Sequence, residues 1–279
     1  MKKFFLALAL AGALGTRANA LAVPDVIPAQ GGTIRITPIY HGSLQIEYRG
    51  KVIHVDPFSA GSYKGAKKAD VILITHTHPD HLDQKALERV VGDPFVHIFG
   101  PKRVTDVLNA RSNPLGVAND NVKEITTIPL NNGSGYNLNT GRNTKNQKQL
   151  FHVEAVPMYN LVRGPEPGQK FHPKGQFNGY ILTLGGKRIY IAGDTEATPE
   201  MKALKNIDIA FLPMNLPYTM TPQEAAAGAR AFKPKIVYPY HYRYPFTKVN
   251  DNPQQFARAL AGSGIEVRLR GWYDHPAAK

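Results

Sequence analysis

Four side chains that can bind a metal ion fall within six residues: His76, His78, Asp80 and His81. They follow an apolar run at residues 71–74, which is typical of a buried strand, and the spacing of a helix begins directly after them. The chain contains no cysteine, so thiolate zinc sites, iron–sulfur clusters and disulfides are excluded. Imidazole and carboxylate remain, and these ligands suit zinc, iron or manganese. The cluster therefore predicts a metal site at the end of a strand.

The spacing within this cluster allows two metal positions. At a strand end, His76 and His78 lie two residues apart and can point to the same side. Pro79 bends the chain, so Asp80 and His81 can turn toward a second position. Two metals bridged by hydroxide lower the pKa of water and supply a nucleophile at neutral pH. Asp80 is also a candidate to shuttle the proton, which would make it a catalytic residue.

Two further candidate ligands follow strands much later in the chain. Residues 189–194 predict a strand that runs into a glycine turn with the Asp194 carboxylate at its tip. A carboxylate has two oxygens and can bridge two cations, although an aspartate in this position can also cap a helix. His241 follows an apolar run at residues 236–239. A lone histidine there is more often structural, so His241 gains meaning only from the other motifs.

In this order, the motifs resemble those of the metallo-β-lactamase-fold hydrolases. His76-x-His78-x-Asp80-His81 resembles the family signature, and residues 192–195 (Ala-Gly-Asp-Thr) resemble its bridging-aspartate motif. Residues 238–242 resemble its terminal histidine motif. The opening at residues 39–43, followed by Val-Asp-Pro at 55–57, resembles the broad branch that includes ascorbate-phosphate lactonases and phospholipase-D-like members. The resemblance extends over nearly all of the chain after its first twenty residues.

The resemblance implies a four-layer αββα sandwich, an α/β (α+β) architecture, with metal ions held between the sheet edges. We expect zinc, as one or two ions, with Mn²⁺ or Fe²⁺ as alternatives. The ligands that the resemblance implies are His76, His78, Asp80, His81, Asp194 and His241.

One position departs from the family pattern. In related branches the segment that matches residues 156–160 ends in a histidine that completes the first metal site, and here it ends in Asn160. An amide oxygen is a weak zinc ligand compared with imidazole, and His172 is the candidate replacement. Three outcomes are open: a two-metal centre that uses His172, a single metal, or a weakened site. We favour retained metal and activity, because the remaining ligand-type residues outnumber the three or four that one zinc needs.

Other side chains are candidates for the pocket rather than for the metal. His41 is a candidate to line the pocket or contact the substrate. Tyrosine at a pocket mouth offers an apolar face and a hydroxyl group, and the candidates for this role are Tyr159, Tyr218, Tyr242 and Tyr244.

The elements that must position these residues recur in the same order in two halves. Short runs rich in β-branched and aromatic residues predict strands at 33–38, 43–48, 52–55, 69–74 and 95–99, and then at 151–156, 179–184, 188–192, 207–212, 236–239 and 265–269. Helical spacing predicts helices at 81–91, 101–110, 199–204, 221–232 and 253–261. Helices that cover only the outer faces of two sheets give helix–sheet–sheet–helix packing.

A polar segment at residues 131–149 interrupts this order. It holds six Asn and four Gly or Ser, with too little apolar material to bury itself. We interpret it as an exposed loop insertion or irregular hairpin within a single metallo-hydrolase domain of residues 21–279. Two domains joined by a linker is the alternative.

The first twenty residues are typical of a signal peptide. Lys2 and Lys3 form a positive start, residues 4–14 are apolar, and residues 18–20 (Ala-Asn-Ala) form a small-x-small cleavage site. The apolar run is shorter than the roughly 20 residues that span a membrane. We therefore expect cleavage after Ala20, no transmembrane segment in the mature chain, and a bacterial periplasmic or secreted protein.

Lys and Arg number 34 against 21 Asp and Glu, a formal net charge of +13. We expect a small-molecule substrate. A basic surface attracts anions, so anionic small molecules are among the candidates. Export and the lack of a basic helix argue against a nucleic-acid partner. The oligomeric state is unknown from the sequence.

These observations favour an exported hydrolase whose metal-activated hydroxide attacks an ester, lactone, amide or phosphodiester bond. The alternative is a non-catalytic protein that binds metal or an anionic ligand through a degenerate first metal site. A β-lactamase or an iron-dependent redox protein ranks lower, because fold alone does not carry function and the opening and Gly-Asp-Thr motifs fit the broader hydrolase branch better.

Overall fold

The computed structural model describes residues 21–92, 95–110, 124–139, 149–246 and 248–277. The predicted signal peptide and its cleavage site at Ala20 lie outside the described residues. Within them, none of the helices is long and apolar enough to cross a membrane.

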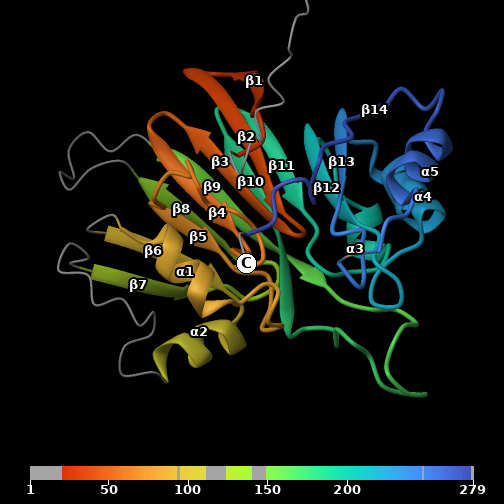
Figure 1. The fold of residues 1–279 in the computed structure, drawn as a ribbon, viewed down its shortest axis with the longest axis horizontal. Coiled ribbons are helices and arrows are strands. Elements are labelled where there is room, and N and C mark those ends of the chain that lie inside the picture. Colours follow the sequence, from red (N-terminus) through yellow and green to blue (C-terminus); the bar gives the residue numbers. More distant parts are fainter. Residues whose placement is uncertain (1–20, 93–94, 111–123, 140–148, 247, 278–279) are drawn as a thin grey trace, which may run out of the picture.

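The β-branched and aromatic runs of each half form their own seven-stranded sheet (Figure 1). The first sheet lies in chain order: β1 (Asp25–Ala29), β2 (Gly32–Tyr40), β3 (Ser43–Tyr48), β4 (Lys51–Val55), β5 (Val71–Leu73), β6 (Phe95–Gly100) and β7 (Glu124–Pro129). The second sheet runs in the reverse spatial order, from β14 to β8: β8 (Gly135–Asn139), β9 (Gln149–Met158), β10 (Phe177–Leu184), β11 (Lys187–Ile191), β12 (Ile209–Pro213), β13 (Ile236–Tyr240) and β14 (Glu266–Val267).

Each sheet begins with antiparallel strands and ends with parallel ones. The first four strands of the first sheet are antiparallel, and β4 to β7 are parallel. The second sheet repeats this pattern, antiparallel from β8 to β11 and parallel from β11 to β14. Parallel neighbours need long crossover connections, and the helices supply several of them. The loops that follow these parallel strands carry the candidate ligands.

The helices lie on the outer sides of the two sheets (Figure 1). The first sheet is covered by α1 (Gln84–Val90) and α2 (Lys102–Asn109), and the second by α3 (Pro199–Lys202), α4 (Pro222–Phe232) and α5 (Asn252–Ala259). The arrangement confirms the predicted αββα sandwich.

Two hydrophobic clusters hold these layers together. The larger one contains side chains of both sheets, such as Ile36 and Leu44 from the first and Leu182 and Ile189 from the second. The smaller one joins the outer face of the first sheet to its helices through Ile72, Ile98, Leu87, Val104 and their neighbours. Because both faces of the parallel strands are covered, β5 and β12 are buried along their whole length.

Three strands of the structure have no predicted strand at their positions, although the hairpin alternative for residues 131–149 allows β8. β1 contains Pro28 and lies at the sheet edge, where a residue without an amide hydrogen is tolerated. β7 lies at the other edge of that sheet. Part of the polar segment 131–149 forms β8, which pairs with β9, so residues 135–139 are an arm of a hairpin rather than loop. Residues 140–148 lie outside the described part.

Candidate metal centre

The candidate ligands follow one strand of the first sheet and two strands of the second sheet. The His76–His81 segment comes after β5, Asp194 lies three residues after β11, and His241 directly follows β13. Ends of parallel strands lie at one edge of a sheet, which is where open α/β sheets bind ligands. The structure brings all six expected ligands together in one cluster, and His172 joins them.

The first group of ligand atoms is formed by His76, His78 and His172, whose candidate nitrogens lie within 4.8 Å of one another. The Nε2 atoms of His76 and His172 are buried and make no hydrogen bond within the described residues. Buried polar atoms without partners are rare. Two such imidazole nitrogens that face one another fit a bound cation.

The second group of ligand atoms is formed by Asp80, His81 and His241. The Nε2 atoms of His81 and His241 lie 3.1 Å apart, and Asp80 Oδ2 lies 3.7 Å from the first and 3.5 Å from the second. The three side chains come from two distant parts of the chain and converge on a common point. This arrangement fits a second cation position.

Asp194 lies between the two groups. Its Oδ1 atom is 3.5 Å from His81 Nε2 and 3.3 Å from His241 Nε2, in the second group. Its Oδ2 atom is 3.7 Å from His172 Nε2, in the first group. Each carboxylate oxygen thus faces a different set of imidazoles, as a carboxylate that bridges two metals must. Gly193 delivers this carboxylate, with a φ of 64° at a place where a Cβ atom would collide with the sulfur of Met158.

Asp56 and Thr75 contact the Nδ1 atoms of two of the imidazoles. Asp56 Oδ2 accepts hydrogen bonds from His81 Nδ1 at 2.8 Å and from the Thr75 hydroxyl at 2.7 Å. The same hydroxyl lies 2.9 Å from His76 Nδ1. Such contacts fix the ring orientation of a metal-binding histidine and leave its other nitrogen free. Neither residue was assigned a role from the sequence, because the contacts of both depend on the turn after β5.

Asn160 holds His172 in the same way. Its Oδ1 atom accepts hydrogen bonds from the backbone N–H of His172 at 2.8 Å and from Nδ1 of that ring at 2.7 Å. Its amide nitrogen donates to Glu196 and to the carbonyl of Tyr218. The side-chain oxygen of Asn160 therefore accepts hydrogen bonds from His172, and His172, the candidate replacement, lies among the ligand atoms.

His41 packs against the second group. Its Nε2 atom lies 3.2 Å from Asp80 Oδ2, its Nδ1 atom lies 2.7 Å from the hydroxyl of Tyr273, and its ring centroid lies 3.6 Å from that of His241. The backbone has a positive φ at His41, Asp56 and His241, which are three of the six such non-glycine residues in the described chain. Backbone strain of this kind persists only where the surroundings hold it in place.

Burial and mutual proximity set the charges of the imidazoles. Burial lowers the pKa of His172 to about 4, and burial together with the neighbouring His81 and His172 lowers the pKa of His76 well below its usual value. Both rings are therefore neutral at pH 7, as a metal ligand must be.

The ring of His81 has the opposite shift. Its burial opposes the charged form, but Asp194, Asp80 and Asp56 outweigh that effect and raise the pKa of His81 to about 10. Three carboxylates around one imidazole attract a positive charge to this point. A proton or a divalent cation can supply that charge.

A cavity of about 490 Å³ opens over the cluster. His78, Asp80 and Asp194 form part of its lining, together with Phe58, Pro79, Phe171, Asn215, Tyr218, Tyr244 and Phe246. Of the four tyrosines that the sequence offered for the pocket, Tyr218 and Tyr244 line it. Tyr159 instead bonds to Glu200, and Tyr242 bonds to the backbone of Arg270.

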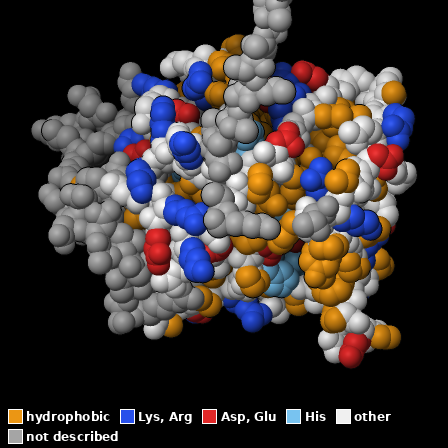
Figure 2. Space-filling model, viewed as in Figure 1, with side chains coloured by type: hydrophobic (Ala, Val, Ile, Leu, Met, Phe, Trp, Pro, Cys, Tyr) orange, Lys and Arg blue, Asp and Glu red, His pale blue; other side chains and the backbone are white. Residues whose placement is uncertain are grey.

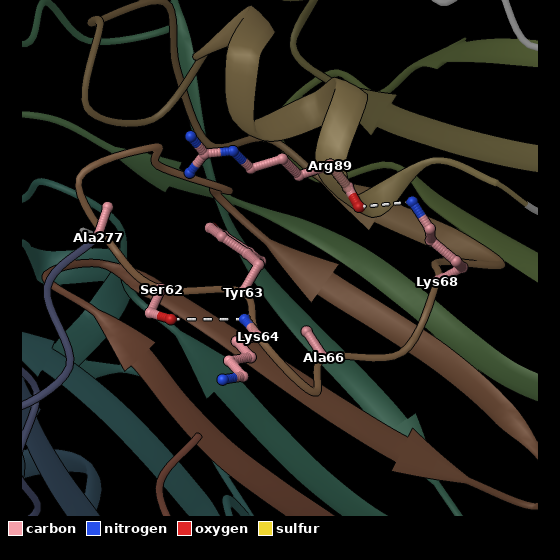
Figure 3. Close-up of a pocket in the computed structure, with 7 residues that line it drawn as sticks. All are labelled: Ser62, Tyr63, Lys64, Ala66, Lys68, Arg89 and Ala277. Atoms are coloured by element: carbon pink, nitrogen blue, oxygen red, sulfur yellow. Dashed lines mark hydrogen bonds between the residues drawn. The ribbon is translucent and has the colours of Figure 1, made fainter. Parts of the chain in front are cut away.

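A second cavity, of about 600 Å³, is lined by Ser62, Tyr63, Lys64, Ala66, Lys68, Arg89 and Ala277 (Figure 3). It contains none of the candidate ligands. Lys68 Nζ donates to the carbonyls of Arg89 and Val91 at the end of α1, and Arg89 donates to the carbonyl of Ser59. The basic side chains thus hold loops together here. Lys and Arg are also dispersed among other residues over the face shown in Figure 2.

Comparison with known proteins places this site in a family. The sequence model of the beta-lactamase superfamily domain matches residues 35–241, a range that contains His41 and every candidate ligand. A UPF0173 metal-dependent hydrolase of Anoxybacillus flavithermus is 30% identical over 240 residues, which cover 82% of this chain and 96% of that protein.

Two solved structures are similar as well. A candidate metal-dependent hydrolase from Parabacteroides distasonis is 41% identical, with a TM-score of 0.69 over 88% of this chain and 97% of that one. Igni18, a metallo hydrolase from Ignicoccus hospitalis, shares the fold at 22% identity, with a TM-score of 0.63 over 85% of this chain and 94% of that one. The chain belongs to the beta-lactamase superfamily and, within it, to the UPF0173 metal-dependent hydrolases.

Proposed function

We propose that this metal-dependent hydrolase cleaves an ester, lactone, amide or phosphodiester bond of a small molecule at a two-metal centre. One observation carries the proposal: the two oxygens of Asp194 face two separate groups of histidines. A site for one structural metal is closed by four ligands, whereas this cluster offers eight ligand-type side chains, His41 among them, beneath an open cavity.

Zinc is the metal that we propose, with Mn²⁺ or Fe²⁺ as alternatives, because imidazole and carboxylate are the available ligands. His76, His78 and His172 would hold one ion, Asp80, His81 and His241 the other, and Asp194 both. Metal ions in such a pair lower the pKa of water and polarise the oxygen of the bond under attack.

Asp80 is the residue that we propose to move the proton. Its side chain is 26% exposed and lines the cavity, and its Oδ2 atom lies near both His41 and His241. In this position the carboxylate can take a proton from the attacking water and return it to the leaving oxygen or nitrogen. Water is the only other reactant: its oxygen bonds to the carbonyl carbon or phosphorus, and its proton leaves with the departing group.

Metal content and turnover, measured on the same preparations, test this function. We expect two equivalents of metal by elemental analysis and hydrolysis of at least one substrate in a panel of esters, lactones, amides, phosphodiesters and a β-lactam. His78→Ala should lose metal and turnover. The matched control is His152→Ala, because His152 lies on β9 and contacts Asn137 far from the cluster along the sheet.

The proposal predicts that His78→Ala loses bound metal and turnover together. Less than one equivalent of metal and no turnover on any substrate class would favour the alternative of a non-catalytic binding protein. Bound iron with a redox-active spectrum and no hydrolysis would favour the redox alternative.

We also propose that the chain is exported and cleaved after Ala20. The positive start, the apolar run and the Ala-Asn-Ala site support this. Expression of the full chain in a bacterium should give a periplasmic protein whose intact mass corresponds to a chain that begins at Leu21. A cytoplasmic protein of full length would contradict the proposal.

A further inference from the structure

Five aromatic side chains surround the cavity above the metal cluster, and they come from different loops. Phe58 follows β4, Phe171 lies between β9 and β10, Tyr218 follows β12, and Tyr244 and Phe246 follow β13. We propose that this aromatic wall selects the substrate, and that the enzyme acts on an uncharged ester, lactone or amide with an aryl or similarly flat apolar group beside the reacting carbonyl. The inference rests on the proposed hydrolytic function.

The five rings form a continuous chain of contacts. Phe171 lies 4.8 Å from Tyr218, and Tyr218 lies 4.9 Å from Tyr244, measured between ring centroids. Tyr244 lies 6.4 Å from Phe246, and Phe246 lies 5.4 Å from Phe58. The interplanar angles range from 59° to 89°, in the tilted and edge-to-face geometries that aromatic rings favour. The five rings therefore form one continuous aromatic wall.

This wall reaches down to the reacting groups. The ring of Phe246 packs 4.6 Å from the ring of His41, and His41 lies against Asp80 in the second ligand group. His78, Asp80 and Asp194 line the same cavity. A substrate whose reacting bond lies over the metal centre would thus place its adjoining group against aromatic faces. The volume of about 490 Å³ is in the range of small-molecule pockets.

The described lining also offers no Lys or Arg side chain to pair with a negative charge away from the metals. Arg243 lies over the ring of Tyr273, and Arg163 is paired with Glu196 and Glu224. A carboxylate or phosphate carried on the substrate into the aromatic wall would lose water without gaining a cationic partner. The basic net charge of the chain therefore does not imply an anionic substrate in this cavity.

Binding of three hydroxamates to the zinc-loaded protein tests the inference separately from turnover. A hydroxamate binds metal through its oxygens, so acetohydroxamate, 2-naphthohydroxamate and 6-carboxy-2-naphthohydroxamate share one anchor and differ in what they place in the cavity. We expect calorimetry to show that the naphthyl compound binds at least tenfold more tightly than the acetyl compound. Its carboxylated analogue should bind at least tenfold more weakly than the naphthyl compound.

Substitutions at Tyr244 test whether the aromatic wall causes the preference for the naphthyl compound. This side chain is 47% exposed, so its removal should leave the fold intact. Tyr244→Ala should reduce the ratio between the naphthyl and acetyl affinities at least fivefold, and Tyr244→Phe should restore it. Tyr136→Ala is the control, because Tyr136 is a similarly exposed tyrosine that contacts Phe99 instead, and its ratio should equal that of the unchanged protein.

The outcomes separate the inference from the function on which it rests. If acetohydroxamate binds and esters are hydrolysed, but the naphthyl compound gains nothing or the carboxylated one binds best, the inference is overturned and the hydrolytic function stands. If no hydroxamate binds the zinc-loaded protein and no substrate turns over, both are overturned.

Discussion

Asn160 and His172 act as one unit at the residue scale. Related branches place a histidine where this chain has Asn160, and the sequence left open whether the first metal position survives. The structure brings His172 beside His76 and His78 and shows Asn160 behind it. Both residues can be seen in the sequence, but their contact depends on a loop that folds back, with the Asn160 N–H donating to the His172 carbonyl at 2.9 Å. Local pattern does not contain that information.

Loss of the Asn160 side chain should weaken metal binding. Asn160→Ala removes the hydrogen bond to the His172 ring and the one to its backbone N–H, and the loss of such a ring contact typically lowers metal affinity 10–100-fold. Competition with a chromophoric chelator measures this zinc affinity. Asn137→Ala, on β8, is the control and should keep the affinity of the unchanged protein. Equal affinities for Asn160→Ala and the unchanged protein would show that His172 needs no such support.

His54 should make the protein less stable in acid. Burial lowers the pKa of His54 to about 4, and its Nε2 atom donates to the carbonyl of Lys67. Because the pKa is lower in the folded chain than the roughly 6.5 of an exposed histidine, protonation favours unfolding. The stability is fully present above pH 6.5 and is lost as the pH falls toward 4, by about 2 kcal/mol at pH 5.

Urea unfolding at pH 7 and pH 5 measures this effect. Burial also lowers the pKa values of His41 and His172, near the metal cluster. The unchanged protein is therefore compared with the variant His54→Gln, which lacks only the His54 effect. The unchanged protein should lose about 2 kcal/mol more than this variant between the two pH values. Parallel losses in both proteins would assign the acid sensitivity to other groups.

At the scale of elements, hydrophobic periodicity was sufficient to predict a helix or strand wherever that element is buried on one or both faces. The five expected helices all form, most of them trimmed by one or a few residues at their ends. α1 begins at Gln84 rather than at residue 81, because Asp83 caps it and the ligand loop occupies the preceding residues. The strands that were missed, β1, β7 and β8, are short or polar and lie at sheet edges, where the partner strand rather than the sequence pattern decides the structure.

The start of α4 offers a stability test that does not involve the metal centre. Thr221 and Glu224 form a capping box in which each side chain accepts a hydrogen bond from the backbone N–H of the other residue. Thr221→Ala should lower the free energy of unfolding by about 1 kcal/mol, and Thr221→Ser should retain most of it. Urea unfolding measures the difference, and zinc content should stay the same. A fall in zinc content would show that α4 also positions the site.

At the scale of the whole molecule, the site exists only where the two halves meet. The first half supplies residues 76–81, and the second half supplies His172, Asp194 and His241. The sequence offered residues 76–81, Asp194 and His241 as candidate ligands because each follows a recognisable strand, and it offered His172 only as a replacement for the histidine missing at Asn160. It did not predict the aromatic wall, in which Phe58, Phe171 and Phe246 joined the two expected tyrosines. Loops of irregular structure, brought together by the packing of the sheets, carry these rings, and no periodic pattern marks them.

A metal ion held by both halves should stabilise the fold as well as the reaction. Ligands that bind only the folded state raise its stability with their concentration, by about 2.7 kcal/mol when zinc is present at 100 times its Kd. The urea midpoint should therefore fall on treatment with a chelator and recover with added zinc. In a His76→Ala/His172→Ala double variant, one ligand is lost from each half, and the midpoint should respond much less to zinc. A full response in the double variant would mean that zinc stabilises the protein elsewhere, and that the two halves are held together by their hydrophobic core alone.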